Sequence, residues 1–133
     1  MKYDRISKDL FLRNRSLFTA KMASNSIAIF CSNDQMPTNA DGTMPFKQNS
    51  DLFWLTGVDQ EQSKVLLHKD KSGDIQEALF VKETSELIAI WEGAKLTKDQ
   101  AYQTSGIQKV EWNTQFDNQF DAMMQEVETV YLN

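Results

Sequence analysis

Few residues of this sequence have the types and spacing that hydrolytic chemistry requires. A zinc site needs several His, Cys or carboxylate ligands at fixed spacing. The 133 residues contain one histidine, His68, and one cysteine, Cys31, without an HExxH or CxxC motif. A Ser or Cys nucleophile also needs a base that takes its proton. We expect His68 to be a strand-end residue with access to solvent, and Cys31 to be a small buried hydrophobe.

Acidic side chains are the remaining candidate ligands, because paired carboxylates can hold Mg²⁺. Four aspartates lie in or beside expected loops: Asp34, Asp41, Asp51 and Asp59. Loop carboxylates are usually solvated, and we interpret these four in that way. A phosphate loop is not indicated, because the five glycines are dispersed and neither GxGxxG nor GxxxxGK occurs.

The first half of the chain predicts a helix, a strand and a long loop. Ser7 can cap a helix that continues to about Met22. Two groups lie on opposite sides of its helical wheel: the apolar Leu10, Phe11, Leu17, Phe18 and Met22, and the polar Arg13, Asn14 and Arg15. Residues 26–32 (SIAIFCS) read as a buried strand, and the polar residues 33–50 as a loop.

The middle of the chain predicts three strands. These are residues 52–55 (LFWL), closed by Thr56 and Gly57, then 64–68 (KVLLH) and 77–81 (EALFV). The polar KDKSGD segment between the last two indicates a hairpin, with Gly73 available for a positive φ.

Helices and strands alternate in the last third. The β-branched residues of the segment ETSELIAIWEG favour a strand, whereas the spacing of Glu83, Leu87, Ile90 and Trp91 favours a short helix. We predict the helix, ended by Gly93. Thr97 and Gln100 form a capping-box pattern for a helix over 98–105, which Gly106 ends. A strand over 107–112 and a helix capped by Asn113 follow, and VYLN begins a last strand. In the final helix one face is apolar: Phe116, Phe120, Met123, Met124 and Val127. This order predicts an α/β domain with a mixed β-sheet flanked by helices.

Length and composition indicate one globular domain over residues 1–133. The net charge is −5 and the 14 basic residues are scattered among 19 acidic ones, so no nucleic-acid surface is predicted. The charged start lacks the apolar region of a secretory signal, and no stretch has the roughly 18 apolar residues of a membrane helix. With one cysteine and no internal disulfide, a cytoplasmic location and no membrane partner are expected.

Two segments carry a resemblance to a known family. PFKQNSDLFWLTG resembles a motif of the amino-terminal domain in the aminopeptidase P branch of the creatinase/prolidase family, and AIWEGAKL resembles that family's Ile-Trp-x-Gly-basic segment. The matching motif residues are Phe46, Lys47, Gln48, Asn49, Ser50, Asp51, Trp54, Thr56, Gly57 and Gly93. The family's second motif usually continues with two basic residues, whereas Ala94-Lys95 supplies one.

The resemblance implies a creatinase/prolidase amino-terminal domain of ribonuclease-H-like topology. It implies that this chain is a C-terminally truncated, non-catalytic part of a metal-dependent Xaa-Pro aminopeptidase, a hydrolase. In this family a carboxy-terminal pita-bread domain, which this sequence does not contain, binds two divalent metals, commonly manganese. No catalytic or metal-binding residue is therefore assigned here, and no cofactor is expected in this chain.

The resemblance also implies a role for the domain. In this family it shapes the substrate cleft and mediates oligomerisation, so the expected partners are its own catalytic domain, further copies, and peptides with proline at the second position. Two family positions that approach the substrate match Asp41 and Trp91. Asp41 would attract the peptide's free α-amino group, and Trp91 would offer a flat apolar wall.

Two other functions stay open. Relatives that have lost the metal ligands use the fold as a peptide- or protein-binding module, as in the large subunit of the FACT histone chaperone. A ribonuclease-H-like nuclease would need carboxylates on adjacent central strands. The expected strands offer only Glu77, so the nuclease is disfavoured.

Overall fold

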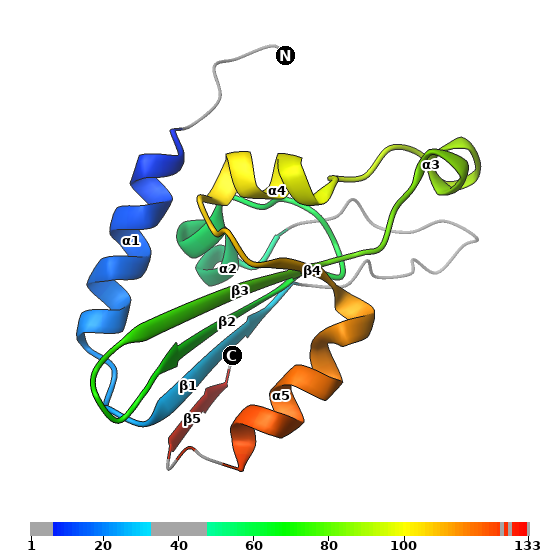
Figure 1. Ribbon diagram of the computed structural model, residues 1–133. Helices are drawn as coiled ribbons and strands as arrows, with labels where there is room; N and C mark the ends of the chain where they lie inside the picture. The colour runs from blue at the N-terminus through cyan, green and yellow to red at the C-terminus, as the bar shows by residue number, and fades with distance from the viewer. Residues whose placement is uncertain (1–6, 33–47, 126, 128, 133) are drawn as a thin grey trace, which may run out of the picture.

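The computed structural model of the chain describes residues 7–32, 48–125, 127 and 129–132. They form a five-stranded sheet in the order β4-β3-β2-β1-β5, with helices on both faces (Figure 1). The strand β2 runs antiparallel to its neighbours β1 and β3, whereas β5 is parallel to β1 and β4 is parallel to β3. The expected α/β class with a mixed sheet is confirmed.

Most element bounds agree with the sequence analysis. The helices are α1 (Lys8–Ala20), α2 (Ser50–Thr56), α3 (Glu86–Glu92), α4 (Lys98–Ser105) and α5 (Phe116–Met124). The strands are β1 (Ser26–Cys31), β2 (Lys64–Lys69), β3 (Ile75–Val81), β4 (Val110–Trp112) and β5 (Thr129–Leu132). The predicted capping box of Thr97 and Gln100 is present at the start of α4. Gly73 adopts a φ of 90° in the β2–β3 turn, as the hairpin prediction required.

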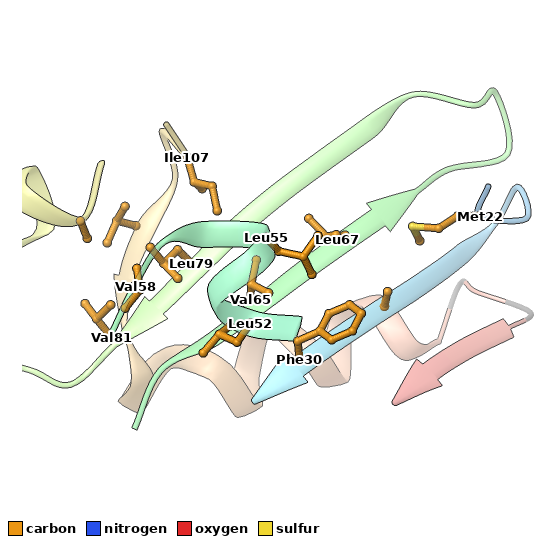
Figure 2. Packing of buried hydrophobic residues seen from close by; sticks show 13 residues of the cluster. Met22, Phe30, Leu52, Leu55, Val58, Val65, Leu67, Leu79, Val81 and Ile107 are labelled. Atoms are coloured by element: carbon orange, nitrogen blue, oxygen red, sulfur yellow. The ribbon is translucent and has the colours of Figure 1, made fainter. Parts of the chain in front are cut away.

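The sheet separates two apolar clusters because successive strand residues point to opposite faces. One cluster joins the sheet to α2 through Phe30, Leu52, Leu55, Val65 and Leu79 (Figure 2). Ala101 of α4 belongs to the same cluster, and Phe18 of α1 packs against it. The other lies under α5, where Phe80 packs edge-on against Phe116. Cys31 is half-buried and packs against this second cluster, as the expected small hydrophobe.

The predicted strand over 52–55 is wrong, because these residues lie inside α2. Asn49 caps the helix: its side chain accepts hydrogen bonds from the backbone N–H groups of Asp51 and Leu52. A seven-residue amphipathic helix buries Leu52 and Leu55 and leaves Trp54 exposed. The aromatic content favoured a strand, but the cap and the packing of α2 on α1 outweigh this preference.

The predicted faces of α1 are confirmed only in part: Phe11 and Met22 are buried and Arg13 is exposed, as expected. Arg15 and Asn14, placed on the outer face by the helical wheel, are buried, while Leu10 and Leu17 are exposed. The reason lies in the neighbouring helices. Asn14 donates to the Trp54 carbonyl, and Arg15 Nη1 donates to the carbonyl oxygens of Leu55 and Ser105, both at 2.8 Å. These carbonyls belong to helix ends, where no partner within the helix exists.

Three further expectations need correction. The strand predicted over 107–112 is shorter, since β4 begins only at Val110. Ile107 precedes it and is buried in the core. Asn113 does not cap α5; it starts a short 3₁₀ turn, Asn113–Gln115, and its side chain donates to the Gln62 carbonyl. Met124 is exposed, although Phe116 is buried on the predicted face of α5.

His68 is buried, with 8% of its surface exposed, and so has much less access to solvent than predicted. It lies within β2, paired with Ile27 on one side and Gln76 on the other. By strand alternation it shares its face with Leu66, which packs in the cluster under α5. The strand runs one residue further than predicted, so His68 is not its last residue, and its side chain lines an open hollow of about 520 Å³ beside Asn25 and Gln125.

Candidate functional site

The first motif is attached through Gln48, its first described residue, to the loop between α2 and β2, residues 57–63. Gln48 Nε2 donates to the carbonyl oxygens of Val58 at 2.9 Å and Gln60 at 3.1 Å. The same side chain accepts a hydrogen bond from the Asn49 backbone through Oε1. One glutamine therefore ties the start of α2 to the loop that follows the helix.

The rest of this motif builds α2 and its exit. Thr56 Oγ1 donates to the Leu52 carbonyl and accepts from the Val58 backbone N–H. Gly57 ends the helix at a φ of 71°, and its N–H donates to the Phe53 carbonyl at 2.7 Å. Ser50 and Asp51 are exposed in the first turn. A carboxylate at that position complements the positive end of the helix dipole.

The second motif forms α3 and presents apolar side chains to solvent. Ser85 caps this helix, and its hydroxyl accepts the Ile88 backbone N–H. Trp91 is 81% exposed, Ile90 75% and Leu87 66%. Gly93 adopts a φ of 91°, a conformation that residues with a side chain rarely adopt, and so turns the chain out of the helix. The predicted contact residue Trp91 is thus available on the surface.

The segment after α3 returns to the same loop that Gln48 holds. Lys95 Nζ lies 2.7 Å from Glu61 Oε1, and both side chains are mostly buried. The Leu96 backbone N–H donates to Gln60 Oε1 at 2.9 Å. The loop 57–63 therefore joins the two motifs, although they are far apart in sequence. Leu96 and Gln60, for example, are 36 positions apart.

An open hollow of about 390 Å³ lies where the segments meet. It is lined by Gly57, Asp59, Gln60, Ala94, Lys95, Leu96, Gln100 and Thr104. Within residues 7–32, 48–125, 127 and 129–132, no three His, Cys, Asp or Glu side chains gather as metal ligands. The described part of this region thus holds the segment that follows the exposed helix α3.

Glu61→Gln is expected to remove a pH-dependent contribution to stability. The hydrogen bond from Lys95 lowers the pKa of Glu61 below its ordinary 4.5, against the opposite effect of partial burial. A carboxylate with a depressed folded-state pKa stabilises the fold above its unfolded pKa and loses this effect as pH falls through the folded-state pKa. Urea titrations should show the wild type more stable by about 0.5–1 kcal/mol at neutral pH.

This difference should shrink as the pH falls below 4.5. Glu83→Gln, at an exposed position before α3, serves as the control for loss of one carboxylate. A difference between wild type and Glu61→Gln that stays constant through the acid range would contradict this account.

The other sequence-predicted residues divide into three groups. Asp41, Phe46 and Lys47, and the loop aspartate Asp34, lie outside the described residues, so their roles stay predictions. Asp59 lines the hollow between the two motifs. Glu77, the carboxylate considered for a nuclease, forms an ion pair at 2.7 Å with buried Arg15.

Gln60 and Glu61 were missed by the sequence analysis. They follow the motif in a polar stretch, VDQEQS, that resembles an ordinary surface loop. The one available signal was the long polar run between two apolar segments, which had to find hydrogen-bond partners wherever it was buried.

A family model supports the motif assignment. The model described as "Aminopeptidase P, N-terminal domain" matches residues 11–131. The chain is similar to the Xaa-Pro aminopeptidase of Escherichia coli K12, with 25% identity over 126 residues, 95% of the chain and 29% of the relative. It is also similar to the Xaa-Pro aminopeptidase of Haemophilus influenzae, with 28% identity over 99 residues, 74% of the chain and 23% of the relative. The chain thus spans less than a third of either relative.

Solved structures support the fold. A protein assigned as an aminopeptidase P from Bacillus anthracis superposes with a TM-score of 0.89 at 23% identity, covering 96% of this chain and 31% of that one. Aminopeptidase P from E. coli with the inhibitor Pro-Leu superposes with a TM-score of 0.85 at 25% identity, covering 97% and 29%. Among the described residues, none of the helices has the length and apolar character that crossing a membrane requires.

Proposed function

Since the chain belongs to the family of aminopeptidase P N-terminal domains, we propose that it is the non-catalytic part of a metal-dependent Xaa-Pro aminopeptidase. In this role it shapes the substrate cleft of a carboxy-terminal catalytic domain and mediates oligomerisation. The main support for the proposal is that Trp91 is exposed on α3. The segment after α3 binds the loop 57–63, which also binds Gln48 of the first motif.

The surface of α3 supports a role in contact with another molecule. Three large apolar side chains, those of Leu87, Ile90 and Trp91, are each about two-thirds exposed or more within one short helix. Such groups are usually buried, and clusters of them at the surface mark sites of protein or ligand contact. An exposed indole ring offers a flat apolar wall to a proline ring or a peptide side chain.

The two divalent metals of such an enzyme do not fit the residues described here. No cluster of three candidate ligands exists in the described part of the chain, and His68 lies within β2 as a largely buried residue. We therefore assign the metals, manganese among the candidates, to the catalytic domain. Asp41 keeps its proposed role of attracting the α-amino group of the peptide.

Trp91→Ala is the direct test, made in a polypeptide that joins this chain to its catalytic domain. We expect kcat/KM for an Xaa-Pro peptide to fall about tenfold, mainly through KM, because a binding surface is lost and the chemical step is not touched. Steady-state kinetics with manganese present measure it. Leu17→Ala, which shortens an exposed apolar side chain on α1, is the control and should leave kcat/KM unchanged.

Two results would contradict the proposal. Equal kcat/KM for Trp91→Ala and wild type would remove α3 from the cleft. Metal-dependent cleavage of Xaa-Pro peptides by the 133-residue chain alone would show that it is catalytic. If the joined polypeptide binds peptides with no cleavage under any metal, the peptide-binding module is the better description.

A further inference from the structure

The helix α3 stands away from the body of the domain. None of its residues with a described side chain is buried. Figure 1 shows α3 beyond the N-terminal end of α4, away from the sheet. Its position therefore depends little on apolar packing, which fixes the other helices. Within residues 48–125, the chain segments on either side of α3 provide the hydrogen bonds that hold it.

Both connections of α3 bear on the loop between α2 and β2. On the entering side, the Ser85 hydroxyl accepts a hydrogen bond from Ile88 within the helix, and the positive charge of Lys82 contributes to lowering the pKa of Glu61. On the leaving side, Lys95 and Leu96 contact Glu61 and Gln60 across the hollow. The leaving side thus ties α3 to a different part of the fold.

The loop that receives this connection is itself held firmly. Gln60 is buried, and its backbone carbonyl accepts hydrogen bonds from Gln48 Nε2 and from Ser63 Oγ. The Gln62 carbonyl accepts a hydrogen bond from Asn113 Nδ2. Because the backbone of this loop is held in place, the Gln60 side chain has a defined orientation. Its hydrogen bond therefore restrains the backbone at Leu96.

From this geometry we infer that Gln60 and Glu61 are positioning residues that hold α3, and with it Trp91, against the α2–β2 loop. Gln60 Oε1 holds the backbone at Leu96 and Glu61 holds the Lys95 ammonium group. The two contacts act on successive residues just after Gly93, which would otherwise leave the exit of α3 free to turn. Only the consequence for peptide cleavage rests on the proposed function.

The test follows the local mobility of Trp91 in the 133-residue chain. Trp54→Phe and Trp112→Phe leave Trp91 as the only tryptophan. In this background, Lys95→Met and Gln60→Met each remove one contact. We expect lower time-resolved fluorescence anisotropy of Trp91, and amide hydrogen exchange at Leu96 about tenfold faster, because a local hydrogen bond no longer resists opening.

Each test variant has a control that makes the same type of substitution at an exposed position. Lys71→Met in the β2–β3 turn and Gln103→Met on α4 alter exposed residues and should change neither signal. If Gln60→Met unfolds the chain, Lys95→Met, at a partly exposed position, still decides the question. Unchanged anisotropy and unchanged Leu96 exchange in Lys95→Met would overturn the inference.

The same Lys95→Met change in the polypeptide with its catalytic domain separates this inference from the proposed function. A raised KM with little change in kcat is expected if a well-placed Trp91 contacts the peptide. If Trp91 becomes mobile while KM stays at the wild-type value, the positioning role stands and the contact of α3 with substrate is refuted.

Discussion

Gly57→Ala is expected to destabilise the chain by about 4 kcal/mol, through two effects that add. The residue adopts a φ of 71°, and a backbone held in this region by a residue with a side chain costs about 1–3 kcal/mol. A Cβ at this position would overlap the ring of Phe11, with Cζ at 2.6 Å. Phe11 is buried and packs edge-on against Phe53, so it cannot retreat without disturbing the α1–α2 contact. Such overpacking costs about 1–3 kcal/mol more.

Two other glycines separate the effects. Gly73 has a φ of 90°, but a Cβ there would meet no described atom within 4 Å beyond its chain neighbours, so Gly73→Ala should cost only the backbone strain. Gly106→Ala should fall between, because the Cβ would meet Leu12, an exposed and flexible side chain, at 2.9 Å. Midpoints of urea unfolding give this order. If Gly57→Ala lowers the stability no more than Gly73→Ala does, the Phe11 ring moves aside without a measurable loss of stability.

The sequence was sufficient for most elements and failed at those whose conformation depends on tertiary contacts. The β-hairpin and α4 have strong local signals in the KDKSGD turn and the Thr97–Gln100 capping box, and both predictions are confirmed. Residues 52–55 have aromatic side chains that suit a strand, yet α2 forms because Asn49 caps it and α1 receives its apolar side. The helix and strand preferences of these residues differ by little, so tertiary packing decides which of the two forms.

The candidate site was predictable in part. The end of α3 at Gly93 was predicted correctly, and the role of the exposed Trp91 as a contact residue stays a prediction. The role of Gln60 and Glu61 could not be predicted, because a hydrogen bond between residues 36 apart leaves no periodicity in the sequence. Only the fold brings the end of α3 beside the α2–β2 loop.

The burial of Arg15, which the helical wheel placed on the outer face of α1, has a specific cause. Its Nη1 donates to carbonyls in the last turns of α2 and α4, and its Nε pairs with Glu77 at 2.7 Å. Both helix ends carry partial negative charge and lack partners within the helix. One guanidinium therefore satisfies two helix ends and a carboxylate from the sheet, and it joins four elements. Apolar periodicity alone cannot reveal such a residue.

Arg15→Met is accordingly expected to cost about 3–5 kcal/mol, a large part of the stability of a domain this size. Methionine fills similar volume, so the loss is one of hydrogen bonds more than of packing. The carbonyls of Leu55 and Ser105 would remain buried without their donor, at about 1–3 kcal/mol each. Urea unfolding at neutral pH measures the change, and Arg13→Met, an exposed neighbour, should stay within about 0.5 kcal/mol of wild type.

Glu77→Gln decides whether the helix ends or the ion pair carries the larger share. The amide oxygen still accepts from Arg15 Nε, and Glu77 is 27% exposed, so water can replace part of the lost charge. We expect a cost of about 1–2 kcal/mol, well below that of Arg15→Met. Equal costs for the two variants would mean that the ion pair dominates. The smaller cost expected for Glu77→Gln follows because two buried carbonyls depend on Arg15, whereas the carboxylate can be rehydrated.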